Sequence, residues 1–308
     1  MKSFKRILIV SALLVILLMA VSDTFGFISY EDMMVFLKLR PPAFTSAELS
    51  VHFIDVGQGD STLIISGDRT VLIDTGDRDG GQKVRSYLIS QKVSHIDYLI
   101  ATHPHSDHTG GVETVLETFD TGTILVPHFS EAGRDEEDLY AWRELNRVTS
   151  EADVTMTEAV PGMKLDLGVS SLSVLAPSGD YEEINNYSVV TELVHGDNTF
   201  LLTGDAETGS EADMLKNGVL EDIDVLKAGH HGSSTSTGSE FLEIVKPEYA
   251  VISCGAGNSY NHPSGSVMKR LGEYGVRVFR TDLQGSIIAE SDGKTICFTT
   301  ADKEQAEK

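Results

Sequence analysis

The stretch "ATHPHSDHTGG", residues 101–111, constrains this chain more than any other because it places three histidines and an aspartate within six positions. Histidine is costly to bury without a partner, so such a cluster predicts ligands rather than an incidental polar loop. The order His103-x-His105-x-Asp107-His108 supplies two pairs of ligands a few residues apart. Two pairs suit two metal ions about 3.5–4 Å apart better than a single ion. Imidazole and carboxylate without thiolate fit Zn²⁺, Mn²⁺ or iron.

Other polar side chains also follow apolar, strand-like runs. Ligand sites in α/β folds collect at the carboxyl ends of strands, so these side chains are expected to meet at one rim of the fold. The residues are Asp74 after "TVLI", His103 after "YLIAT", Asp205 after "TFLLTG", His230 and His231 after "DVLKAG", and His262 further along from "YAVISCG".

Short β-branched runs and tight turns open the main part of the chain, and strand-like and helix-like segments alternate after them. Strands are expected at 51–56, 61–66, 70–76, 98–102, 123–127, 171–177, 188–196, 199–205, 224–230, 249–255 and 276–282. Helices are expected at 82–90, 110–119, 136–148, 207–218, 239–246 and 266–275. Two halves in which strands lead into helices predict an α/β fold, a four-layer αββα sandwich.

The first residues form a targeting signal. Lys2, Lys5 and Arg6 precede a nearly unbroken apolar run from Ile7 to Val21, which is short for a spanning helix of ~20 residues. Residues 1–25 are therefore expected to be a signal peptide, cleaved near Ala20-Val21-Ser22, or to stay as a membrane anchor. Either way, the positive residues place the rest outside the cytoplasm, secreted or tethered only by this segment.

The remaining boundaries come from composition. Residues 26–48, broken by Pro41 and Pro42, are expected to be a linker. Residues 49–300 show no repeat or low-complexity stretch and are expected to form one monomeric domain, followed by a charged tail at 301–308. Cys254 and Cys297 could pair, but we expect two buried free thiols, and neither lies in a CxxC zinc motif.

The charge limits the partners. Acidic residues outnumber basic ones 47 to 24, which gives a net charge of −23. This field repels nucleic acid and anionic lipid at long range, so a polyanionic substrate would need bound cations. The loop "GQGDS", Gly57–Ser61, lacks the lysine of a phosphate-binding loop and is expected to be a tight turn with Asp60 near the site.

Together these motifs resemble the metallo-β-lactamase superfamily. "VLIDTG" resembles its first motif, which makes Asp74 the carboxylate that orients a ligand histidine, and "LLTGD" resembles its fourth, whose aspartate, here Asp205, bridges both metals. More narrowly, "FIDVGQGDSTLI", "NNYSVV", "VLKAGHHGSS" and "NSYNHPS" resemble the β-lactamase-like domain of ComEC-type competence proteins and secreted phosphorylcholine esterases. The resemblance covers residues 49–300 and implies a metallo-β-lactamase-like hydrolase domain.

The resemblance also implies the ligand sets. The first metal would take His103, His105 and Asp205 with water, because residues 185–188, "NNYS", stand where the family has a further histidine. The second metal would take Asp107, His108, Asp205 and one histidine of "GHHGSS". Alternation along a strand would send His230 and His231 to opposite sides.

We expect His231 to be the ligand and His230 to be a phosphate contact or general acid, with Asp107 and His230 as the candidate catalytic residues. His262 either lines the pocket or caps a loop. Structural roles are expected for the histidines without partners at ligand spacing, which are His52, His95, His128 and His195.

Two bound divalent ions, Zn²⁺ first with Mn²⁺ or iron as alternatives, would lower the pKa of a bound water toward ~7. The leading hypothesis is an extracytoplasmic phosphodiesterase or nuclease that acts on nucleic acid, a nucleotide or a phosphocholine polymer. A lactamase or lactonase is the alternative hydrolase, although the missing third-motif histidine counts against a lactamase. A non-catalytic binding protein with a vestigial metal site is a third hypothesis. Metal content and turnover of bis-(p-nitrophenyl) phosphate separate the three.

Overall fold

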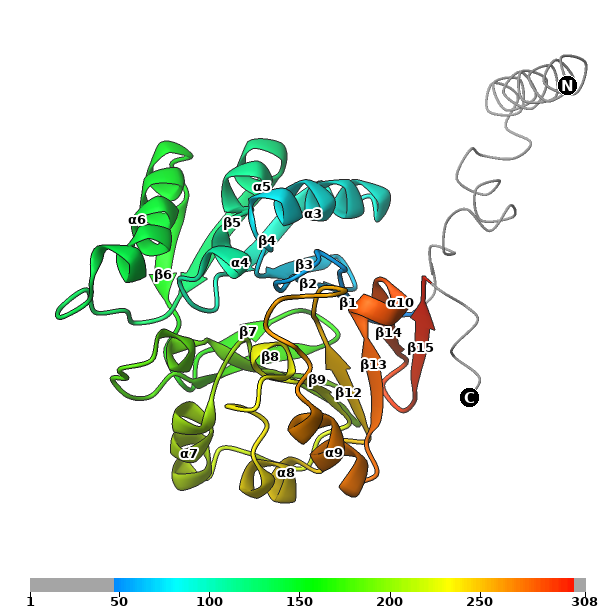
Figure 1. The fold of residues 1–308 in the computed structure, drawn as a ribbon. Helices are drawn as coiled ribbons and strands as arrows, with labels where there is room; N and C mark the ends of the chain where they lie inside the picture. Colours follow the sequence, from blue (N-terminus) through cyan, green and yellow to red (C-terminus); the bar gives the residue numbers. More distant parts are fainter. Residues whose placement is uncertain (1–46, 302–308) are drawn as a thin grey trace, which may run out of the picture. The chain divides into compact units, whose positions relative to one another are not determined.

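The structure, a computed structural model, describes residues 47–301 (Figure 1). The predicted signal or anchor at 1–25, nearly all of the linker at 26–48 and the tail beyond residue 301 lie outside the described residues. Within residues 47–301, no helix combines the length and the apolar character needed to cross a membrane.

The described residues form two β-sheets. The first sheet has eight strands in the order β15-β14-β1-β2-β3-β4-β5-β6, and the second has seven in the order β13-β12-β11-β10-β9-β8-β7. The first sheet contains β1 (Leu49–Phe53), β2 (Thr62–Ser66), β3 (Arg69–Ile73), β4 (His95–Ile100), β5 (Asp120–Val126), β6 (Thr155–Glu158), β14 (Ile287–Ser291) and β15 (Ile296–Thr300). The second contains β7 (Lys164–Asp166), β8 (Ser171–Ala176), β9 (Val190–His195), β10 (Asn198–Leu202), β11 (Val225–Lys227), β12 (Tyr249–Ile252) and β13 (Arg277–Arg280).

Helices cover the outer face of each sheet. On the first sheet these are α3 (Arg78–Ser90), α5 (Val112–Thr118) and α6 (Glu136–Glu151), and on the second they are α7 (Thr208–Asn217), α8 (Ser239–Val245) and α9 (Gly265–Glu273). Figure 1 shows the two helix layers on opposite sides of the paired sheets. The predicted αββα sandwich is confirmed. Four short elements complete the list: α4 (Ser106–Thr109), α10 (Thr281–Gln284), η1 (Ile184–Tyr187) and η2 (His230–Gly232).

The inner strands carry consecutive apolar residues because both faces of each sheet are covered. On β10, Phe200 and Leu202 pack between the two sheets, whereas Leu201 packs against the helices of the second sheet. On β3, Val71 and Ile73 face the partner sheet and Leu72 faces α3 and α5. Side chains that point alternately to the two faces of a strand thus fill both helix–sheet interfaces and the central sheet–sheet interface.

The parallel strands bring their carboxyl ends level with one another. Ile73 at the end of β3 pairs with Ile100 at the end of β4, and Leu202 of β10 pairs with Lys227 of β11. Lys227 in turn pairs with Val251 of β12. The loops that follow these strands therefore leave the two sheets at the same rim.

Four strands of the structure were not predicted from the sequence. β6 and β7 are short, and β14 and β15 form a hairpin that extends the first sheet beside β1. Cys254, after β12, is buried, but Cys297 on β15 is exposed, so the expectation of two buried thiols is wrong for Cys297. Both are free thiols.

Phe200→Ala is expected to lower the free energy of unfolding by about 3–5 kcal/mol, because it leaves a cavity between the two sheets. Urea denaturation followed by circular dichroism measures the loss. Leu283→Ala serves as the control: Leu283 is 48% exposed, and its truncation should change stability by no more than about 0.5 kcal/mol. Equal losses in the two variants would contradict the assigned core.

Candidate metal centre

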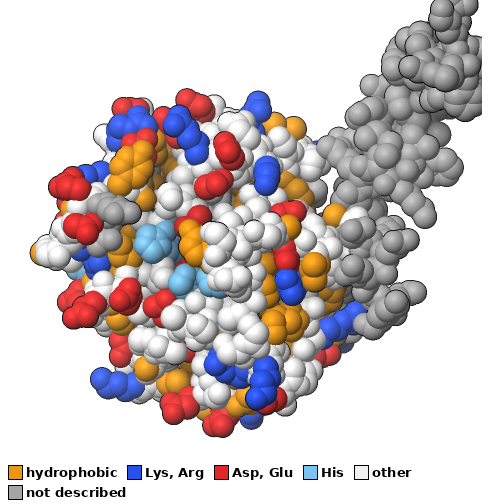
Figure 2. All heavy atoms as spheres, viewed as in Figure 1, with side chains coloured by type: hydrophobic (Ala, Val, Ile, Leu, Met, Phe, Trp, Pro, Cys, Tyr) orange, Lys and Arg blue, Asp and Glu red, His pale blue; other side chains and the backbone are white. Residues whose placement is uncertain are grey.

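A cavity of about 720 Å³ opens at the rim where the strands end. Histidine side chains are visible together in the middle of this face of the molecule (Figure 2). The cavity is lined by Gln58, Pro104, His105, Ser106, Asp107, Glu136, Tyr140, Ala141, Asp205, His230, His231, Tyr260 and His262. These residues come from helix α6 and from the segments that follow strands of both sheets, so the site depends on the way the sheets pack together.

His103 and His105 converge after β4. Nε2 of His103 lies 3.1 Å from Nδ1 of His105, so the two ring nitrogens face the same point. Burial lowers the pKa of both rings, and the neighbouring His108 lowers it further. Neutral rings offer lone pairs, which is the form that binds a metal ion.

Asp74 holds His108 in one orientation. Its carboxylate accepts hydrogen bonds from Nδ1 of His108 at 2.7 Å and from the amide and hydroxyl of Thr102 at 2.8 and 2.7 Å. With Nδ1 occupied in this way, Nε2 of His108 points to the site and lies 3.2 Å from Asp205. This is the arrangement of a carboxylate that orients a ligand histidine.

Asp205 lies at the centre of the site. Its Oδ2 is 3.2 Å from Nε2 of His108, 3.3 Å from Nε2 of His231 and 3.9 Å from Nε2 of His230. Burial alone would raise the pKa of this carboxyl, but His108 and His231 hold it well below its usual value. The hydroxyl oxygen of Ser188 accepts a hydrogen bond from the backbone N–H of Asp205, with an N–O distance of 2.9 Å, and lies 3.3 Å from Nδ1 of His103.

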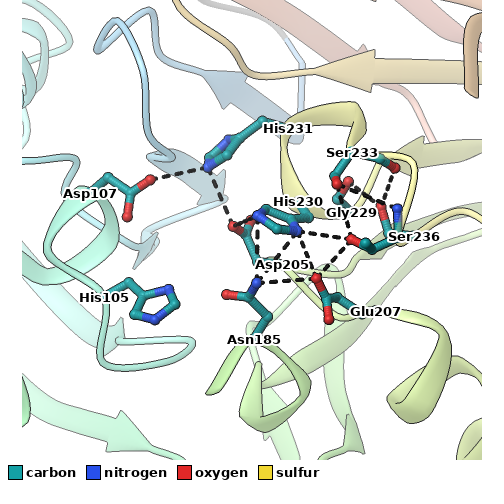
Figure 3. Close-up of polar contacts among 12 residues, drawn as sticks. His105, Asp107, Asn185, Asp205, Glu207, Gly229, His230, His231, Ser233 and Ser236 are labelled. Carbon is teal, nitrogen blue, oxygen red and sulfur yellow. Dashed lines mark hydrogen bonds and ion pairs between the residues drawn. The ribbon is translucent and has the colours of Figure 1, made fainter. Parts of the chain in front are cut away.

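His231 completes the second group of predicted ligands. Its Nδ1 donates to the carbonyl of Ser253 at 2.9 Å, which leaves Nε2 3.3 Å from both Asp107 and Asp205 (Figure 3). The structure thus brings together all six residues that were predicted as metal ligands: His103, His105, Asp107, His108, Asp205 and His231. Their roles as ligands remain a prediction.

His230 turns to a different partner. Its Nδ1 lies 2.9 Å from Oε1 of Glu207, an oxygen that also accepts from Thr235 at 2.7 Å and from Asn185 at 3.3 Å (Figure 3). Sequence reasoning missed Glu207, although it follows Asp205 by two residues in "GDAE". Nε2 of His230 then faces Asp205 at 3.9 Å on the cavity side, with the amide nitrogen of Asn185 at 3.5 Å.

Alternation along a strand was predicted to send the side chains of His230 and His231 to opposite sides, and this reason is wrong. β11 ends at Lys227, and the two histidines lie in the short turn η2 with φ of 48° and 53°. Strand alternation therefore does not act on them. The tight turn separates the rings instead, with an interplanar angle of 63°.

The donor atoms fit a divalent metal. Nε2 of His108 and Oδ1 of Asp205 are buried without a hydrogen-bond partner, which is costly unless a cation lies between them. Atoms of Asp60, His108, Asp205 and His231 all lie within 4.8 Å of one another. Asp60, expected to be near the site, therefore lies close to three of the predicted ligands.

The other histidines fall outside the metal centre, with one exception. His262 lines the cavity, and its ring lies 5.5 Å from that of His230. The remaining four bond to polar groups elsewhere: His52 to Tyr87, His95 to Asp120, His128 to Glu158 and His195 to Ser291.

The sandwich and its histidine–aspartate centre define a metallo-β-lactamase-type fold, a class whose members are generally metal-dependent hydrolases. Residues 54–256 match the family described as the metallo-beta-lactamase superfamily, and the chain belongs to that superfamily. Among solved structures, the metallo-beta-lactamase fold protein YhfI from Bacillus subtilis superposes with a TM-score of 0.54 at 13% identity, over 79% of this chain and 100% of that one.

Competence proteins are among the relatives. The chain is 34% identical to ComE operon protein 3 of Bacillus subtilis over 79% of its own length and 33% of that protein's. It is 33% identical to competence protein ComA of Neisseria gonorrhoeae over 85% of its own length and 34% of that protein's. The chain spans about a third of the length of these relatives, as expected from a resemblance to one domain of ComEC-type proteins.

The full chain, loaded with Zn²⁺ or Mn²⁺ and desalted, is expected to carry about two ions, because two groups of donors share Asp205. His231→Ala should lose about one ion, since it removes a ligand from only one group. Elemental analysis measures both values. His128→Ala, at an exposed histidine paired with Glu158, is the matched control and should keep the wild-type content. A wild-type content that never exceeds one ion would contradict the dinuclear centre.

Proposed function

We propose that this protein is an extracytoplasmic, dinuclear metal-dependent phosphodiesterase or nuclease. The observation that carries the proposal is the pairing of two donor groups around Asp205 with a histidine, His230, that a carboxylate holds beside them. The substrate we propose is a phosphoester in nucleic acid, a nucleotide or a phosphocholine polymer. Zn²⁺ is the first choice of metal, and Mn²⁺ or iron the alternatives.

The lining of the cavity supports a substrate bound through metal ions. Among the described residues that line it, none is lysine or arginine, whereas Asp107, Glu136 and Asp205 are acidic. A phosphate group would meet repulsion there unless cations were bound. Two divalent ions would supply Lewis acidity to the phosphoryl oxygens and lower the pKa of a bound water.

The chain's own groups would then position the substrate and the leaving group. Because Glu207 accepts a hydrogen bond from Nδ1 of His230, Nε2 is the atom left to contact a phosphate oxygen or to give a proton to the leaving oxygen. Tyr140 and Tyr260 line the same cavity and are 67% and 66% exposed. Their rings could stack on a base or lie against a quaternary ammonium group.

Hydrolysis of bis-(p-nitrophenyl) phosphate by the metal-loaded chain tests the proposed reaction. Activity should disappear when the metal is removed by a chelator and should return when it is restored. Turnover of a β-lactam or lactone without turnover of any phosphodiester would contradict the proposal. Metal binding without hydrolysis of any ester would favour a binding protein.

His230→Ala is expected to keep the wild-type metal content yet lower the rate about 10²–10⁴-fold, the usual contribution of a general acid or a charge contact. A diester with an activated leaving group should recover part of this loss if His230 is an acid, and none if it only binds phosphate. His128→Ala, which changes an exposed histidine, should leave the rate unchanged. Loss of metal from His230→Ala would show that His230 is a ligand instead.

Residues 1–48 are expected to carry a fused reporter across the cell membrane, because a positive segment precedes the apolar run Ile7–Val21. The fusion partner is a phosphatase that is active only outside the cytoplasm. Replacing Lys2, Lys5 and Arg6 by glutamate gives the control and should reduce export. A stable but inactive wild-type fusion would contradict the extracytoplasmic location.

A further inference from the structure

A buried ion pair next to the metal centre has no role in the chemistry described above. Nζ of Lys227 lies 2.5 Å from Oδ2 of Asp60, and both side chains are 3% exposed. Lys227 ends β11 in the second sheet, whereas Asp60 lies in the loop before β2 in the first sheet. The pair therefore joins the two sheets at the site.

The ammonium of Lys227 has no free proton. It donates to the carbonyls of Gly204 and Ala228, each at 3.1 Å, in addition to its contact with Asp60. Three acceptors saturate an ammonium group. Since Gly204 directly precedes Asp205, Lys227 fixes both the backbone next to Asp205 and one oxygen of Asp60.

The other oxygen of Asp60 has no such partner. Oδ1 is buried and accepts no hydrogen bond from any described residue. A carboxylate oxygen of Asp60 lies within 4.8 Å of ligand atoms of His108, Asp205 and His231. Oδ2, the oxygen bound by Lys227, lies 3.8 Å from Nδ1 of His231. A buried carboxylate with an unsatisfied oxygen is costly, and the charge of a cation held by those three residues would offset that cost.

The turn that carries Asp60 is built against another predicted ligand. The amide of Asp60 donates to the carbonyl of Asp107 at 3.2 Å. A Cβ on Gly59 would lie within 2.4 Å of that same carbonyl oxygen, and its φ of +142° also disfavours a side chain. Glycine at position 59 thus allows the loop to approach closely enough for Asp60 to reach the site.

We propose that Asp60 is an acidic member of the metal centre and that Lys227 is the residue that positions it. Asp60 stabilises a bound cation through its negative charge, because one of its carboxylate oxygens lies within 4.8 Å of the ligand atoms of His108, Asp205 and His231. Lys227 holds the other oxygen and anchors the backbone beside Asp205. This inference rests on the metal-dependent part of the proposed function and is independent of phosphoester hydrolysis.

The test compares three full-length variants, Asp60→Asn, Lys227→Met and the double variant D60N/K227M. Affinity for Zn²⁺ is measured on metal-free protein by competition with a chromophoric chelator. Asp60→Asn is expected to weaken binding about 10–100-fold, the usual effect of losing an outer partner of a metal site. The decisive comparison is the double variant with Lys227→Met, because the ion pair is already broken in both. The double variant should bind at least about tenfold more weakly, as Asp60 acts on the metal itself.

An ion pair that only holds the two sheets together gives a different result. Asp60→Asn would then change nothing in the Lys227→Met background, and equal affinities in the two variants would overturn the proposal. If Lys227→Met does not fold without metal, Lys227→Gln and D60N/K227Q replace the two variants, since the ion pair is again broken in both, with the same expected and overturning results. Lys83→Met is the control: this lysine binds the carbonyl of Val56 near the same loop and should not affect metal affinity. A wild-type chain that binds two ions but hydrolyses no phosphodiester would overturn the proposed function alone.

Discussion

The buried carboxylate of Asp205 and the histidines that contact it determine how the two sheets must pack. Asp205 is 2% exposed. Burying an isolated carboxylate there would cost on the order of several kcal/mol of desolvation free energy. Its partners come from different sheets: His108 follows β4 in the first, and His231 follows β11 in the second. The two sheets must therefore pack with their carboxyl-terminal rims together. The parallel pairing of β10, β11 and β12 and the wide apolar interface between the sheets hold them in that arrangement.

Residues 185–188, "NNYS", depart from the family pattern, and the two predicted metal positions therefore differ in their number of protein ligands. Where the family has a histidine, Asn185 donates to Glu207 and Ser188 accepts the amide proton of Asp205. This segment therefore supports His230 and the backbone of Asp205 rather than presenting a ring to a metal. The ion beside His103 and His105 would then have fewer protein ligands than the ion beside His108, and an open position suits a reacting water or substrate.

Most of the site was predictable because its ligands are local in sequence or end a strand. The spacing from His103 to His108 and the positions of Asp74 and Asp205 after apolar runs point to a metal centre without tertiary information. Glu207 and Lys227 gave no such signal. Lys227 lies inside the apolar run "DVLKAG" and looks like an ordinary strand residue, and only the packing of the sheets brings Asp60 to it. The strands β14 and β15 were missed because the pairing of a terminal hairpin with β1 is a long-range choice.

The negative charge of the molecule links the binding of metal ions to the proposed binding of a phosphoester substrate. A net charge of −23 repels a polyanion at a distance, and Asp107, Glu136 and Asp205 repel it within the cavity. Divalent ions in the centre would reverse the sign of the field over a few ångströms, where screening by salt is weak. Under the proposed function, the ions would both supply the chemistry and attract the phosphate group. On this view the buried acids, Asp60 among them, do not merely hold the metals. They would let a strongly acidic protein keep a small cationic site, as the proposed phosphoester substrate requires.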